Sequence, residues 1–369
     1  MNVSFLRPLY ERPGPWASVY LDGTRNNEDP AGTVERRWRA ARTTLERALC
    51  EPENLDALER ALLGHTEEDG LYGLAAFATD GEVAMLRVLP APPRRDIAAY
   101  GPLPHAMPLL AQMGESIPYV RVLVDRTGGD LEAVDAAQLV HSEHVEGAEQ
   151  WPLHRVKPGG WSQPRYQRAA QVTWERNAGT VAAAVADAAE RCGAEIVLVA
   201  GDPQARPMLI AQLPEHWRGR VVETSGTTGE AVLEDATVQA IADRAAERVR
   251  DVLDRYQSQR GRGAAAGDGL PAVVTALQRG QVGTVVLVDD PTSNAELWIG
   301  PEPSQLSFDR AELQAMGVRD TRRVRADAAL VRAIACSDAD LVFAAGDELP
   351  VEGGVGALLR YADAGTRRR

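Results

Sequence analysis

The stretch from residue 117 to residue 222 constrains the fold more than any other part of the sequence, because two kinds of hydrophobic periodicity follow each other there. Three β-rich runs separated by turns occupy residues 119–145. A long helical pattern covers residues 165–192, and residues 195–200, which are apolar after Glu195, then indicate a buried strand. Hairpins followed by β-α-β elements predict a mixed sheet of the ribonuclease-H-like type.

The rest of the chain shows its own patterns, so the sequence predicts three domains of α/β (α+β) class. A chain of 369 residues exceeds the roughly 250–300 residues that a single core holds. Residues 1–115 combine a predicted hairpin with two helical stretches and form an N-terminal α+β domain. The middle domain spans residues 116–229. An amphipathic helix at residues 230–262 connects it to residues 263–369, which are predicted to form a small α/β sandwich.

Composition and charge exclude several classes of protein. The net charge of −13 argues against a protein that coats nucleic acid by bulk electrostatics, so any contact with nucleic acid must be local. No apolar run reaches the ~18–20 residues of a membrane span, and the first residues lack a secretory signal pattern. Cys50, Cys192 and Cys336 lie far apart, without the spacing of a metal site or a disulfide framework. We therefore expect a cytoplasmic protein that binds neither membranes nor DNA.

Acidic and histidine residues offer a few candidate metal sites. His141 and His144 have a spacing that suits a metal on a helix, but they fall in a predicted strand and are expected to be exposed. The acids at residues 289–290 follow a strand, yet the chain has no G-x-x-x-x-G-K-[ST] loop. Asp125 and Asp202 each follow a strand of the middle domain and could belong to a metal-dependent nuclease, which needs further acids. The sequence predicts no metal and no cofactor, with the nuclease as an alternative.

The segment from residue 151 to residue 176 is locally basic. Its five basic residues are Arg155, Lys157, Arg165, Arg168 and Arg176. Its one acid is Glu175, so five positive charges minus one negative charge leave +4 in a chain of −13. Lys157 is also the single lysine among 40 Lys and Arg residues. Either this position requires a compact ammonium group, or Lys157 remains by chance in a sequence with Arg-rich codon usage.

A glycine pair and an aromatic residue lie inside this basic segment. Gly159 and Gly160 allow close approach to another backbone, and Trp161 could stack on a base while the basic residues neutralise phosphates. A purely structural interpretation is a loop in which Ser162 caps the following helix and Pro164 occupies its first turn. The two interpretations are compatible, because a cap fixes the base of a loop whose tip is free to bind.

Gly159-Gly160-Trp161-Ser162-Gln163, followed by Arg165-Tyr166-Gln167-Arg168, resembles a known motif. A Gly-Gly loop ending in Gln, which leads into an Arg-rich helix in the middle of three domains, is similar to the archaeo-eukaryotic class-1 release factor and Pelota superfamily. The resemblance is closest to its bacterial branch, which includes the Balon-type ribosome hibernation factors of actinobacteria. It also implies that the last domain resembles the ribosomal-protein-like C-terminal domain of release factors.

The resemblance implies a ribosome-binding, release-factor-like protein that occupies the A site in hibernation or stress-related translation control. Its implied partner is the 70S ribosome, through ribosomal RNA near the peptidyl-transferase and decoding centres. Elongation factor Tu is a further candidate partner that only the resemblance implies. The implied RNA-binding residues are Arg155, Lys157, Gly159, Gly160, Trp161, Ser162, Gln163, Arg165 and Arg168. The alternative is a peptidyl-tRNA hydrolase or rescue factor that uses Gln163. Trp161 and Ser162 separate Gly160 from Gln163, so the Gln163 amide is displaced from the glycine pair. This displacement favours a protein that only occupies the A site over a hydrolase, since positional errors of about 1 Å already impair catalysis.

Overall fold

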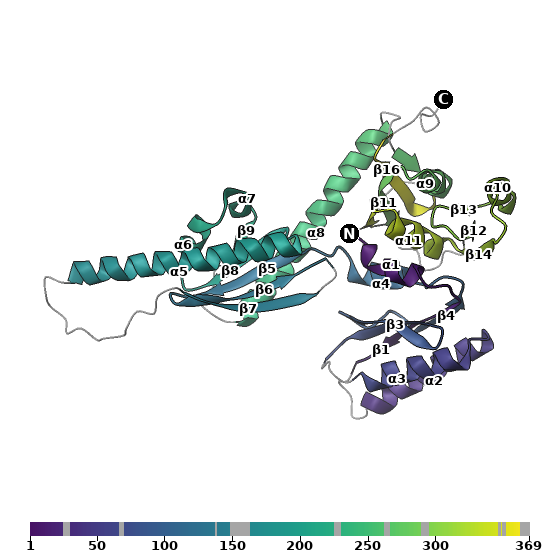
Figure 1. Ribbon diagram of the computed structural model, residues 1–369, viewed down its shortest axis with the longest axis horizontal. Helices are drawn as coiled ribbons and strands as arrows, with labels where there is room; N and C mark the ends of the chain where they lie inside the picture. Colours follow the sequence, from purple (N-terminus) through teal and green to yellow (C-terminus); the bar gives the residue numbers. More distant parts are fainter. Residues whose placement is uncertain are drawn as a thin grey trace. The chain divides into compact units, whose positions relative to one another are not determined.

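The computed structural model describes residues 1–24, 30–65, 70–136, 139–147, 163–224, 230–261, 266–288, 295–345, 348 and 352–361. The elements form two compact units (Figure 1). Unit 1 combines Met1–Glu115 with Val249–Arg369, and unit 2 is Ser116–Arg248. Both units mix helices with sheets, which confirms the predicted α/β class. Among the described residues, none of the helices combines the length and apolar character needed to span a membrane.

Unit 2 is built on one five-stranded sheet. Its strands are β5 (Tyr119–Val124), β6 (Gly128–Val134), β7 (Val140–Glu146), β8 (Ile196–Gly201) and β9 (Val221–Glu223). They lie in the order β7-β6-β5-β8-β9. The first three strands pair antiparallel, while β8 runs parallel to both β5 and β9. The mixed sheet predicted from the hairpin and β-α-β patterns is confirmed.

Helices pack on both faces of this sheet because its central strands are apolar on both sides. One face carries α5 (Gln163–Cys192), α6 (Ala205–Gln212) and α7 (Glu215–Arg218). There Val122 and Val199 share a core with Val181 of α5. The opposite face packs against α8 (Glu230–Gly261), where Leu198 meets Leu233. The Glu195 carboxylate, directly before β8, also binds α8, since it accepts hydrogen bonds at 2.9 Å from both Arg244 and Arg248.

The first segment of unit 1 is an antiparallel sheet with two helices on one face. Its strands are β1 (Trp16–Asp22), β2 (Gly73–Thr79), β3 (Glu82–Leu89) and β4 (Ile97–Gly101), in the order β3-β2-β1-β4. The helices are α2 (Pro30–Arg47) and α3 (Pro52–Gly64), with Trp38 and Leu58 buried against Val19. Smaller elements are the 3-10 helix η1 (Ser4–Leu6), α1 (Arg7–Tyr10) and α4 (Met107–Met113).

The last segment of unit 1 contains two small sheets. The larger has the order β10-β16-β11-β15, and the smaller has the order β13-β12-β14. The strands are β10 (Ala266–Asp268), β11 (Val282–Val288), β12 (Glu296–Ile299), β13 (Leu306–Ser307), β14 (Arg322–Arg325), β15 (Asp340–Ala344) and β16 (Val355–Leu359). The helices are α9 (Gly269–Gln278), α10 (Arg310–Ala315), α11 (Ala326–Cys336) and the 3-10 helix η2 (Glu352–Gly354).

The first and last segments of unit 1 share one hydrophobic core. Trp16, Tyr20 and Phe77 on the second face of the first sheet belong to the same buried cluster as Leu330 and Ile334 of α11. This shared core explains why the predicted domains 1–115 and 263–369 group in one unit, although each keeps its own sheets.

Candidate functional site

The predicted binding loop lies mostly outside the described residues. Arg155, Lys157, Gly159, Gly160, Trp161 and Ser162 fall in the range 148–162, which the structure does not describe. Gln163, Arg165 and Arg168 belong to the first two turns of α5, where the structure gives the helical backbone. The structure therefore places these three positions together at the start of one helix, whereas the sequence predicts a helix from residue 165 and puts Gln163 in the loop before it.

The N-terminal end of α5 projects beyond the sheet that the rest of the helix covers. A helix of 30 residues is about 45 Å long, whereas a strand of seven residues spans about 23 Å. Figure 1 shows that the overhang is at the N-terminal end of α5. Burial of described α5 residues begins at Thr173, whereas Val172 is 46% exposed. Residues 163–172 thus form an arm of about 15 Å that carries the predicted loop.

The turn between β5 and β6 contacts the chain before this loop and the body of α5 after it. On one side, the Gly147 amide, directly after β7, donates to the Thr127 carbonyl at 2.7 Å. On the other side, Asn177 of α5 donates from Nδ2 to the Arg126 carbonyl at 3.0 Å and is 2% exposed. The Arg126 guanidinium also lies 4.6 Å from the ring centre of Trp174. Gly147, which precedes the loop, and the buried part of α5 therefore rest on the same turn, which serves as their common support.

The support itself is rigid because Asp125 closes its own turn. Asp125 Oδ1 accepts hydrogen bonds from the Thr127 amide at 2.6 Å, the Thr127 hydroxyl at 2.7 Å and the Gly128 amide at 2.8 Å. Burial alone would raise the pKa of Asp125, but these hydrogen bonds outweigh burial and hold that pKa below its ordinary value. The carboxylate stays charged and keeps the turn folded at neutral pH.

The acids of the nuclease alternative are close in the fold but are used as structural acceptors. Asp125 and Asp202 follow strands β5 and β8, whose ends Val124 and Gly201 are register partners. Asp202 forms an ion pair with Arg126 at 3.0 Å and accepts from the Gln204 amide at 2.7 Å. Within the described ranges, His, Cys, Asp and Glu form no cluster of three that could hold a metal ion. This arrangement disfavours a two-metal nuclease.

The two histidines of β7 are exposed, as predicted. His141 and His144 lie on a strand, where residues three apart point to opposite faces. Nδ1 of His144 lies 2.6 Å from Oδ1 of Asp130 on β6. The hydrogen bond with Asp130 raises the pKa of His144 above its ordinary value. The pair is a cross-strand surface contact.

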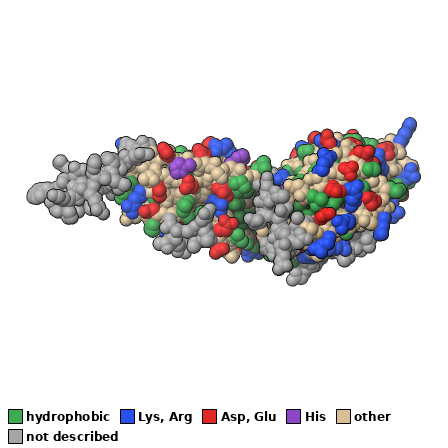
Figure 2. Space-filling view, turned by 90° about the horizontal axis from the view of Figure 1, so that it is seen from below, with side chains coloured by type: hydrophobic (Ala, Val, Ile, Leu, Met, Phe, Trp, Pro, Cys, Tyr) green, Lys and Arg blue, Asp and Glu red, His purple; other side chains and the backbone are tan. Residues whose placement is uncertain are grey.

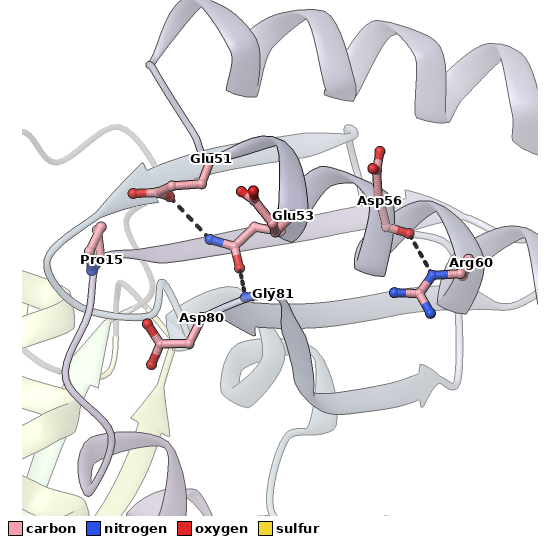
Figure 3. Close-up of a pocket in the computed structure, with 8 residues that line it drawn as sticks. Pro15, Glu51, Glu53, Asp56, Arg60, Asp80 and Gly81 are labelled. Atoms are coloured by element: carbon pink, nitrogen blue, oxygen red, sulfur yellow. Dashed lines mark hydrogen bonds between the residues drawn. The ribbon is translucent and has the colours of Figure 1, made fainter.

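The first segment of unit 1 contains an acidic pocket that sequence reasoning missed. The pocket has a volume of about 560 Å³, and its acidic residues are Glu51, Glu53, Asp56 and Asp80 (Figure 3). Asn54 ties its walls together, since Nδ2 donates to Glu51 at 3.1 Å and Oδ1 accepts from the Gly81 amide at 2.8 Å. Negative charge repels phosphate, so this pocket does not suit a contact with RNA. Figure 2 likewise shows acidic and basic side chains interspersed over the face that it views.

Comparisons with known proteins address the middle of the chain most directly. Residues 118–262 match the family model "Bacterial archaeo-eukaryotic release factor family 2". The uncharacterized protein Rv2629 of Mycobacterium tuberculosis (strain ATCC 25618 / H37Rv) is 29% identical, with 98% of this chain and 97% of that protein covered.

Solved structures show weaker similarity, over 80–98% of the chain. Dom34 of S. cerevisiae, a translation termination-like factor, is 10% identical, with 80% of this chain and 82% of that chain covered and a TM-score of 0.41. Archaeal Pelota, from a ribosome-bound model with ABCE1, is 14% identical, with 98% and 94% covered and a TM-score of 0.40. The family model matches the part of the chain that contains the loop and α5, so it supports the resemblance to the release factor and Pelota superfamily.

Proposed function

We propose that this protein is a ribosome-binding, release-factor-like translation factor that occupies the A site. The observation that carries the proposal is the match of residues 118–262 to a bacterial release factor family, because this range contains both the glycine loop and α5. The proposed setting is ribosome hibernation or another stress response in the cytoplasm, in the manner of Balon-type factors.

The geometry of α5 supports a contact between its N-terminal end and ribosomal RNA. The first turn of a helix carries a partial positive charge that attracts phosphates. Arg165 and Arg168 lie in the first two turns of an arm that projects about 15 Å from the sheet, so this charge is added where the chain reaches furthest from its own core. The rigid turn at residues 125–128 would then fix the direction in which the loop leaves the domain.

The position of Gln163 supports an occupant over a hydrolase. Gln163 is the first residue of α5, so its backbone follows the helix, and two residues separate it from the Gly159-Gly160 pair. A release catalyst needs its glutamine at the tip, where the ester of peptidyl-tRNA lies. A hydrolase that uses Gln163 is therefore the second candidate.

The proposal for an A-site occupant also includes elongation factor Tu as a delivery partner.

Co-sedimentation with 70S ribosomes tests the proposal. The protein should pellet with stationary-phase ribosomes, A-site tRNA should compete with it, and binding should weaken as salt rises because phosphate contacts release counterions. A protein that stays in the supernatant at low salt, with elongation factor Tu present, would contradict the proposal.

Single-turnover peptide release from the same complexes separates the two candidates. An occupant should release little peptide, and Gln163→Ala should leave its binding intact. Trp161→Ala should weaken binding by about 1–3 kcal/mol, the contribution of one stacked base. Release that disappears in Gln163→Ala without loss of binding would instead identify a hydrolase.

A further inference from the structure

Unit 1 contains a second cavity, which lies between its first and last segments. It has a volume of about 320 Å³ and is bordered by the chain between Tyr10 and Trp16, by residues 299–301 and by Arg332 of α11. Its walls thus come from residues more than 280 positions apart in the sequence. The volume is at the lower end of the range for small-molecule sites.

Arg332 places a buried positive charge at this cavity. The residue is 7% exposed and lies on a helix whose other residues are apolar or small for most of its length. Its guanidinium donates to the carbonyls of Gly300, at 2.9 Å, and Pro301. In the part of the chain that the structure describes, no carboxylate lies within ion-pair distance of it. Burial lowers the pKa of Arg332, which reflects the cost of holding a charge there.

Tyr10 adds a hydroxyl donor at the same cavity. Its oxygen is buried and has no hydrogen-bond partner among the described residues. Burial raises the pKa of Tyr10 far above its ordinary value, so the hydroxyl keeps its proton and can donate it in a hydrogen bond. Because a buried hydroxyl without a partner is destabilising, an acceptor that enters the cavity would gain from both Tyr10 and Arg332.

The remaining walls supply apolar surface and arginines that already have carboxylate partners. Trp16 and Leu103 line one part of the cavity. Of the charged residues at its border, Arg12 contacts Glu82 at 3.1 Å and Arg322 contacts Asp320 at 3.7 Å, while Glu11 is exposed to solvent. The charge of Arg332 is therefore the one that an incoming anion would balance.

We propose that this cavity binds a small metabolite that carries an oxyanion, a carboxylate or a phosphate. One oxygen accepts hydrogen bonds from Arg332 and Tyr10, and the body of the molecule packs against Trp16 and Leu103. Such a ligand touches both segments of unit 1 and stabilises their association, because binding to the folded state alone raises the free energy of unfolding. This site is independent of the ribosome.

Thermal unfolding of the full-length protein, without ribosomes, tests the proposal. The probes are inorganic phosphate, acetate and benzoate at up to about 10 mM and constant ionic strength, a range that detects even millimolar binding. At least one probe should raise the Tm in a saturable manner. Phosphate alone would identify a phosphate site, and the two carboxylates alone would identify a carboxylate site, with benzoate favoured if the apolar wall contributes.

Two variants and a control decide whether the response comes from this cavity. Tyr10→Phe removes a hydroxyl that has no partner, so the unliganded variant should be as stable as the wild type while it binds the probe about tenfold more weakly. Arg332→Gln should abolish the response. Arg39→Gln removes an exposed arginine of α2 that pairs with Glu35 and should respond as the wild type does. The proposal is overturned if no probe gives a saturable shift, or if Tyr10→Phe responds like the wild type.

Discussion

Replacing Gly147 by alanine should loosen the turn on which Gly147, directly before the loop, and Asn177 of α5 meet. An added Cβ would lie 2.5 Å from the Thr127 carbonyl oxygen and even closer to the Asn177 side chain. A backbone oxygen cannot rotate away, so the chain must shift, and overpacking of this kind costs about 1–3 kcal/mol. Asn177→Ala should cost a similar ~1–3 kcal/mol, because the buried Arg126 carbonyl loses its partner.

The two substitutions should not be additive. Asn177→Ala removes one of the two groups that the new Cβ meets, so the double variant should lose about 1 kcal/mol less than the sum of the single variants. Hydrogen exchange measured by mass spectrometry on peptides that cover residues 125–147 reports this local opening. Each single variant should exchange roughly 5- to 150-fold faster there. The matched control is Gly219→Ala, whose Cβ would meet no atom within 4 Å.

Unchanged exchange in Gly147→Ala, or an increase equal to that in Gly219→Ala, would refute the claim that the turn holds Gly147 against α5. Strict additivity would show that Gly147 and Asn177 act separately. Ribosome binding by the same variants adds a functional measurement. If the turn matters for binding, the variants that lose protection from hydrogen exchange should also bind ribosomes more weakly.

Three other substitutions test separate parts of the molecule. Charge reversal at Arg165 and Arg168 together should weaken co-sedimentation with ribosomes and leave the Tm nearly unchanged; a lower Tm with full binding would indicate a structural role. Asp130→Asn should lower the raised pKa of His144 toward its ordinary value in an NMR titration, because the hydrogen bond with the Asp130 carboxylate is what raises that pKa. In the wild type this bond stabilises the fold at pH values below the ordinary pKa of histidine, and the stabilisation is lost as the pH rises through the raised pKa. Glu195→Ala should destabilise unit 2 by about 1–3 kcal/mol in urea, since two arginines of α8 lose their acceptor; an unchanged midpoint would contradict this.

Regular periodicity made unit 2 predictable, and short or proline-rich segments hid parts of unit 1. The strands at residues 119–146 alternate cleanly or end in glycine turns, and α5 begins within two residues of its predicted start. By contrast, the prolines between residues 90 and 108 interrupt any regular period, although β4 and the start of α4 lie there. The strands β12–β14 have two to four residues each, too few to show a period.

The candidate sites also differ in how far the sequence predicts them. The glycine loop is contiguous, so its composition and charge could be seen in the sequence alone. Tyr10 and Arg332 carry no motif and are brought together by tertiary packing across 322 positions. The isolated arginine in the alanine-rich stretch of α11 is the one signal that the sequence offered, because a charge inside an otherwise apolar helix requires a reason.

The shared core of unit 1 sets an order of events during synthesis. Trp16, Tyr20 and Phe77 emerge early, but their packing partners on α11 follow roughly 250 residues later, a delay of about 12–50 s at 5–20 residues per second. Unit 2 is complete before those partners exist. One apolar face of the first sheet therefore stays open while the middle of the chain folds, and a ribosome that stalls before residue 326 leaves that face uncovered for chaperones or proteases.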